Sequence, residues 1–166
     1  MAEIRKHYSS ERVRPAFDVV PIARASLRRV FDSWGLNELS DDAENVLSEL
    51  LTNAITFVLG QGEAAAWVSY SFMIRDGRVE VRVWDPYPDA LPEPREPDFV
   101  SQSGRGLFIV DALADDWSVQ RYDTGKTVWA SWPVFPKAPR TPAGAPADSQ
   151  PPGELPIPAV GAGPPP

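Results

Sequence analysis

The segment LSELLTNAITF, residues 47–57, carries a carboxylate and an amide four positions apart, at Glu49 and Asn53. On a helix, this spacing places both side chains on one face, about a turn apart. A carboxylate and an amide oxygen so arranged suit Mg2+, which takes a few protein oxygens together with water and phosphate oxygens. The glutamate can also accept a proton from an attacking hydroxyl group or water. Taken alone, the pair is better explained as the polar edge of an amphipathic helix.

The segment SGRGLFIVDAL, residues 103–113, places Gly104 and Gly106 on either side of Arg105 at an expected helix start. Glycines let the backbone approach a ligand, and the free N–H groups and dipole of a helix start favour an anion. The alternative is an ordinary glycine-rich helix entry. A long loop with five prolines, residues 85–103, directly precedes the helix, as a lid over a phosphate would require.

Asp85 is the last residue of the segment RVEVRVWD, in which valines alternate with charged residues, and the long loop follows it. A carboxylate at a strand end can accept a hydrogen bond from the exocyclic amine of adenine. Guanine presents a carbonyl at the same position and would be rejected, because two acceptors would face each other. The alternative is that Asp85, followed by Pro86, simply initiates a turn.

The elements that would position these residues follow from hydrophobic periodicity. A first strand is expected at residues 13–20, and Pro21 suits the first turn of a helix that stops at Gly35. Ser40-Asp41-Asp42 is expected to cap a second helix that runs to about Leu59. Alternating residues predict strands at 68–74 and 79–83, joined by a hairpin turn at Asp76-Gly77.

A third helix is expected at residues 106–113, and two closing strands at 117–122 and 126–132. The order helix, helix, hairpin, loop, helix, hairpin predicts an α+β fold. We expect a two-layer sandwich in which helices cover one face of a mostly antiparallel sheet. Residues 1–12 are expected to form a flexible arm, and residues 133–166, rich in Pro, Ala and Gly, a disordered tail.

The composition of the chain argues against several classes of function. A net charge of −7 and a pI near 4.7 argue against nucleic acid as the main partner. Without cysteine there is no disulfide or thiolate metal site, and the single His7 leaves little for a histidine metal cluster or a catalytic triad. No apolar run approaches the roughly 20 residues that span a bilayer, and the N-terminus lacks a signal peptide's apolar stretch. We therefore expect a cytoplasmic protein with no membrane partner.

The segments SELLTNA, VRVWD, GRGLFIVDAL and GKTVWASW, taken in this order, resemble the GHKL superfamily of histidine-kinase-like ATPases. The nearest branch is that of the bacterial anti-sigma-factor serine/threonine kinases. The resemblance spans about residues 13–132 and leaves out the C-terminal segment.

This resemblance implies a Bergerat-type fold with a mobile lid, and ATP and Mg2+ as cofactors. Glu49 would be the general base and Asn53 the Mg2+ ligand, and Asp85 would hold the adenine amine. The triphosphate would be lined by Gly104, Arg105, Gly106 and Leu107. Thr127 would sit near the adenine. The partners implied are a sigma factor and an anti-anti-sigma protein that receives the phosphate on a serine or threonine, with a homodimer as a further expectation.

The chain also departs from the superfamily. The adenine loop usually reads D-x-G-x-G, but Asp85 is followed by Pro86-Tyr87-Pro88-Asp89, and Phe57 stands where the kinase branch often has histidine. These changes leave open a non-catalytic module that uses nucleotide as a structural ligand or switch. A nucleotide-free interaction domain is a further alternative. A sensor histidine kinase fits poorly, since His7 is the only candidate phosphoacceptor.

Overall fold

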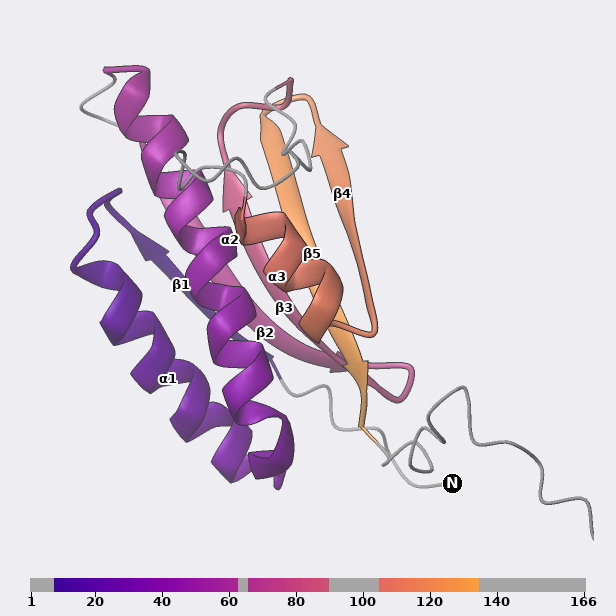
Figure 1. Ribbon diagram of the computed structural model, residues 1–166. Coiled ribbons are helices and arrows are strands. Elements are labelled where there is room, and N and C mark those ends of the chain that lie inside the picture. Colours follow the sequence, from indigo (N-terminus) through magenta and orange to yellow (C-terminus); the bar gives the residue numbers. More distant parts are fainter. Residues whose placement is uncertain (1–7, 63–65, 90–104, 135–166) are drawn as a thin grey trace, which may run out of the picture. The chain divides into compact units, whose positions relative to one another are not determined.

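A five-stranded antiparallel sheet carries three α-helices on one of its faces (Figure 1). The computed structural model describes residues 8–62, 66–89 and 105–134, and all of them belong to the compact unit Met1–Pro136. In chain order the elements are β1 (Tyr8–Val13), α1 (Val19–Ser33), the short 3-10 helix η1 (Asn37–Leu39), α2 (Ser40–Gly60), β2 (Val68–Arg75), β3 (Arg78–Asp85), α3 (Arg105–Leu113), β4 (Asp116–Tyr122) and β5 (Gly125–Pro133).

The strands lie in the order β1-β2-β3-β5-β4, so β5, the last of the described strands, is inserted between β3 and β4. The predicted hairpin between β2 and β3 is confirmed. Asp76 and Gly77 have φ angles of 51° and 74°, the left-handed values that a tight two-residue turn needs. The predicted β4–β5 hairpin is confirmed as well. The expected α+β two-layer architecture is therefore correct.

The first strand lies earlier than the periodicity predicts. Residues 13–20 do not form a strand, because β1 ends at Val13 and α1 begins at Val19. The strand itself is the polar segment YSSERV, which pairs with β2 in the register Tyr8↔Met73 to Val13↔Val68. Residues 8–12 of the expected arm thus form the edge of the sheet. This polar edge strand lacks the alternating apolar residues from which strands are predicted. It is formed by its hydrogen bonds to β2, which the sequence of the segment itself does not reveal.

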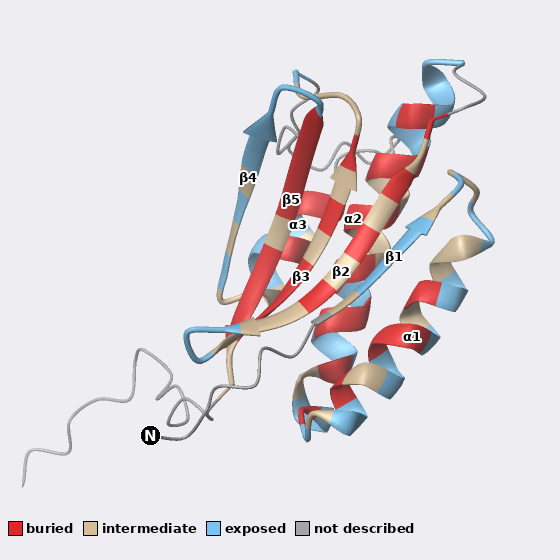
Figure 2. Cartoon of the chain, turned by 180° about the vertical axis from the view of Figure 1, so that it is seen from behind, coloured by how far each residue is buried: buried red, intermediate tan, exposed pale blue. Residues whose placement is uncertain are grey.

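The helix α2 lies over the middle of the sheet and supplies much of the core. Its apolar stripe is buried, as the spacing predicts: Leu47, Leu50, Leu51, Ala54, Ile55 and Val58. Figure 2 shows the buried segments of β2, β3 and β5 backing this layer, while β4 at the edge is largely exposed. The predicted cap is wrong, because the helix begins after Leu39 and no side chain caps it.

A buried carboxylate joins the first two helices. Glu44 of α2 is 3% exposed and pairs with two arginines of α1: Arg28 Nε lies 2.6 Å from Oε1, and Arg24 Nη2 lies 3.3 Å from Oε2. The pairing fixes α2 against α1, so the face of α2 that bears Glu49 and Asn53 has a defined orientation. Among the helices described, none is long and apolar enough to cross a membrane.

Candidate nucleotide site

The start of α3 lies directly against the two polar residues of α2. A Cβ atom added to Gly106 would stand 2.8 Å from Glu49 Oε2 and 3.0 Å from Asn53 Nδ2. A Cβ at this position would force the flexible ends of both side chains to move, so glycine is what permits this close approach. The structure therefore brings together three residues that the sequence marks separately, from segments more than fifty positions apart.

Glu49 and Asn53 are not paired with any residue that the structure describes. Both side chains are half-buried. Burial raises the pKa of the Glu49 carboxyl above its ordinary value. A half-buried carboxylate whose pKa is raised by desolvation is suited to accept a proton.

The oxygens of Glu49 and Asn53 are also of the kind that bind Mg2+. No group of three or more His, Cys, Asp or Glu side chains that could hold a metal occurs in the described segments. Mg2+ is commonly held by one or two protein oxygens while phosphates and water complete its shell. Glu49 and Asn53 fit that pattern, and the glycine facing them leaves the backbone of α3 open to an anion.

The remaining residues of the glycine segment are only partly described. Arg105 begins α3, Leu107 is buried, and Gly104 lies outside the described residues together with most of the expected lid. The far end of α3 is anchored to the sheet, because Trp132 Nε1 donates a hydrogen bond of 2.8 Å to the Leu113 carbonyl. The helix that carries Gly106 is thus attached to β5.

Asp85 lies at the end of β3 and is paired with a lysine. Its side chain and that of Lys126 are each 4% exposed, and Lys126 Nζ donates to Asp85 Oδ1 at 2.8 Å. The Tyr87 N–H donates to the same Oδ1 at 3.0 Å, and Lys126 Nζ donates to the Tyr87 carbonyl at 3.0 Å. Burial raises the pKa of Asp85, although Lys126 and the Tyr87 N–H oppose the shift. The carboxylate expected to meet adenine already accepts two internal hydrogen bonds.

Phe57 links the two halves of the site. It follows Asn53 by four residues on α2 and therefore lies on the same helical face as Glu49 and Asn53. Lys126 Nζ stands 5.4 Å from the centre of its ring, and the ring meets that of Tyr87 edge-on at 5.3 Å. The eight residues from Glu49 to Phe57 correspond to about 12 Å along the helix axis. One face of α2 thus runs from Gly106 to the Asp85–Lys126 pair.

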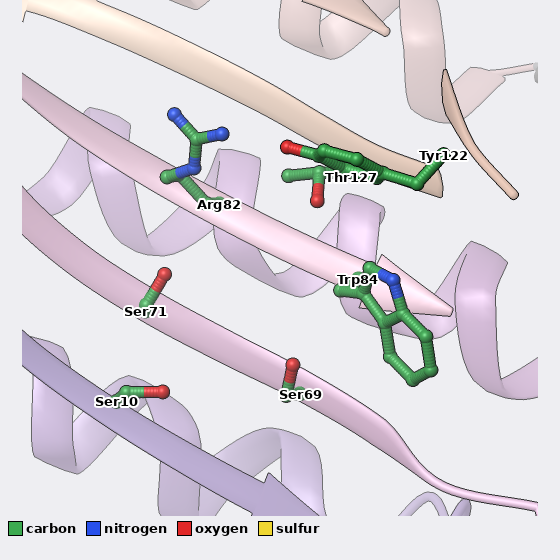
Figure 3. A pocket seen from close by; sticks show the side chains of 7 residues that line it. All are labelled: Ser10, Ser69, Ser71, Arg82, Trp84, Tyr122 and Thr127. Carbon is green, nitrogen blue, oxygen red and sulfur yellow. The ribbon is translucent and has the colours of Figure 1, made fainter. Parts of the chain in front are cut away.

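Thr127 is not brought into this group. It pairs with Trp84 across β3 and β5, and both residues face away from the helices. Figure 3 shows Thr127 with Trp84, Arg82 and Tyr122 around a shallow hollow on that opposite face. The residue of the GKT segment that reaches the helix side is Lys126. Lys126 is spaced two residues apart from the buried series Val128, Ala130 and Trp132, and this period of two was the signal in the sequence that Lys126 lies on the core face of β5.

Comparisons with known proteins identify the family of this chain. A family model described as a histidine kinase-like ATPase domain matches residues 13–132. The serine-protein kinase RsbW of Staphylococcus epidermidis is 24% identical over 137 residues, which cover 73% of this chain and 83% of that protein. The same values hold for RsbW from two strains of this species.

A solved structure is also similar. It contains the RsbU and RsbW domains of a Mycobacterium tuberculosis protein, with 18% identity and a TM-score of 0.51. The match covers 75% of this chain and 31% of that longer one, and at this identity it concerns the fold. The resemblance indicated by the motifs is therefore confirmed: the chain belongs to the histidine kinase-like ATPase domain family.

Proposed function

We propose that the chain is a regulatory protein kinase, which uses Mg2+–ATP to phosphorylate a serine or threonine of an anti-anti-sigma partner and thereby controls a sigma factor. The observation that carries this proposal is the meeting of Gly106 with Glu49 and Asn53. The similarity to a serine-protein kinase supports the class of reaction. Sigma factors act on RNA polymerase, so the proposed partners imply work in the cytoplasm.

The roles of the residues follow from their chemistry. Glu49 would take the proton of the acceptor hydroxyl, since burial raises the pKa of its carboxyl. Asn53 would contribute an oxygen to Mg2+, and the backbone around Gly106 would face the phosphates. Bound Mg2+–ATP supplies the phosphoryl group. Because phosphoryl transfer depends mainly on positioning and charge stabilisation, few catalytic side chains are required.

The first test separates metal-dependent binding from folding. Calorimetric titration of ATP into the full chain, with and without Mg2+, should show binding that depends on the metal and weakens at least about tenfold in Asn53→Ala. Asn45→Ala is the matched control, because Asn45 is an exposed residue of the same helix. Equal effects of the two substitutions would contradict the role given to Asn53.

The second test concerns transfer. Glu49→Gln should retain ATP binding and lose phosphorylation of an anti-anti-sigma substrate by about 100-fold or more, because it removes the general base. Glu38→Gln, at an exposed position of η1, is the matched control and should behave as the wild type. Full transfer by Glu49→Gln would show that the base lies elsewhere.

A non-catalytic module is the second candidate function, and the engaged state of Asp85 favours it. In that case the chain would bind its protein partner with an affinity that changes with nucleotide, and no phosphate would move. Wild-type protein that binds Mg2+–ATP but phosphorylates no partner over hours would support this candidate against the kinase.

A further inference from the structure

We propose that Lys126 sets the base selectivity of the nucleotide site: its ammonium group takes the place of the adenine amine on Asp85, so the site does not discriminate ATP from GTP. This inference rests on the proposed function, because it assumes that nucleotide phosphates bind at Gly106, Glu49 and Asn53. It concerns the opposite end of the same site.

The contacts of Asp85 leave little for a purine amine to gain. Lys126 Nζ and the Tyr87 N–H both donate to Oδ1, and Lys126 Nζ returns to the Tyr87 carbonyl. An adenine amine that displaced the ammonium would exchange an ion pair, in which donor and acceptor are both charged, for a weaker hydrogen bond from a neutral donor. It would also leave a buried ammonium without its counter-ion, which is strongly unfavourable. Both bonds go to Oδ1, and an amine that reached Oδ2 would meet a carboxylate whose charge the ammonium already neutralises, so adenine gains less than it would from a lone carboxylate.

The same lysine removes the reason for rejecting guanine. Opposite a lone carboxylate, the guanine carbonyl would bring two acceptors together, and the unpaired groups would weaken binding. The ammonium of Lys126 supplies a donor beside that carboxylate, and a carbonyl oxygen can accept from it. The penalty that ordinarily separates the two purines is thereby cancelled. The site therefore loses both its preference for adenine and its penalty against guanine.

Lys126 is held in this position by its neighbours. A Cβ on Gly125 would overlap the Asp85 carbonyl oxygen and stand 2.8 Å from the Trp84 ring, so glycine brings β5 unusually close to the end of β3. The Phe57 ring lies 5.4 Å from the Lys126 ammonium and the Tyr87 ring packs on Phe57. The pair is therefore part of the packed interior and differs from a surface contact that a ligand could displace easily.

The decisive measurement uses the unmodified chain. ATP and GTP, each with Mg2+, are titrated by calorimetry under the same conditions, and we expect dissociation constants within about threefold of each other. Binding of ATP more than about thirtyfold tighter than GTP would overturn the inference and leave the proposed function intact. Failure of both nucleotides to bind at millimolar concentration would overturn the proposed function, and this inference with it.

A substitution tests the cause. Lys126→Thr should tighten ATP binding about tenfold and leave GTP binding unimproved, because Asp85 regains its free acceptor. The matched control is Arg121→Thr, which removes a positive charge at the exposed β4 position opposite Lys126 and should keep the wild-type ratio. An unchanged ratio in folded Lys126→Thr would contradict the assignment. If that variant does not fold, the wild-type ratio still decides.

Discussion

Gly106 of α3 and Glu49 of α2 are so close that a Cβ on the glycine would stand 2.8 Å from Oε2 of the glutamate. The start of α3 and the polar face of α2 are thus in direct contact, and the absence of a side chain at Gly106 allows this contact. A substitution at Gly106 tests this contact while Glu49 stays unchanged.

Gly106→Ala should abolish Mg2+-dependent nucleotide binding with little loss of stability. The added methyl group would push aside Glu49 and Asn53, while alanine favours the helix by about 0.5–1 kcal/mol relative to glycine. Calorimetry and urea unfolding measure the two effects. The control is Gly60→Ala at the end of α2, where a Cβ meets nothing within 4 Å. Normal nucleotide binding by Gly106→Ala would contradict the importance of this contact.

Glu49→Gln should stabilise the protein at neutral pH. Burial raises the pKa of Glu49 in the folded chain, so the folded state binds the proton more tightly than the unfolded state does. Stability is therefore lost as pH rises from the ordinary glutamate pKa, about 4.3, through the raised value in the folded state. The gain from Glu49→Gln should be present at pH 7 and absent at pH 3. Unfolding curves at both values check the sign, and equal gains would contradict it.

The Asp85–Lys126 pair should show strong energetic coupling. Asp85→Asn or Lys126→Met alone leaves a buried group without its counter-ion and should cost about 3–5 kcal/mol. The double variant should lose much less than the sum of the two single losses. Urea unfolding of the four proteins gives the coupling energy. Additive losses would mean that the pair does not act as a unit.

Glu44 should matter more for stability than its exposed neighbour Asp41, although both pair with Arg28. The Glu44 side chain is 4% exposed, and Glu44→Gln should cost about 1–3 kcal/mol, because α1 loses a charged anchor. The Asp41 side chain is 88% exposed, and Asp41→Asn should cost about 0.5 kcal/mol or less. Thermal or urea unfolding compares the two. Equal losses would show that burial does not set the strength of this contact.

The local elements could be predicted because the signals that define them are local. The apolar stripe of α2 and the Asp76-Gly77 turn are written in neighbouring residues, and both agree with the structure. The glycine at 106 was also recognisable, although its partners on α2 were implied by resemblance and not by spacing. That part of the candidate site could be anticipated because the resemblance covers several segments taken in a fixed order.

The Asp85–Lys126 end of the candidate site could not be anticipated in the same way. The period of two places Lys126 on the face of β5 that carries the buried core residues, but the residue of β3 that it meets depends on how the two strands pair. The contact between Lys126 and Asp85 joins positions 41 residues apart, so no local pattern reports it. The polar edge strand β1 was missed for a related reason, since its partner lies some sixty residues away.

The place of β5 in the sheet also has a consequence for how the chain acquires its site during synthesis. Among the described strands this one is the last in sequence, yet it lies between β3 and β4. A growing chain that has not reached residue 126 therefore carries Asp85 without its counter-ion, and β3 is paired with β2 but not yet with β5. Closing this long loop is an entropically costly, late step. The Asp85–Lys126 end of the candidate site is thus completed only when almost all of the folded domain has left the ribosome.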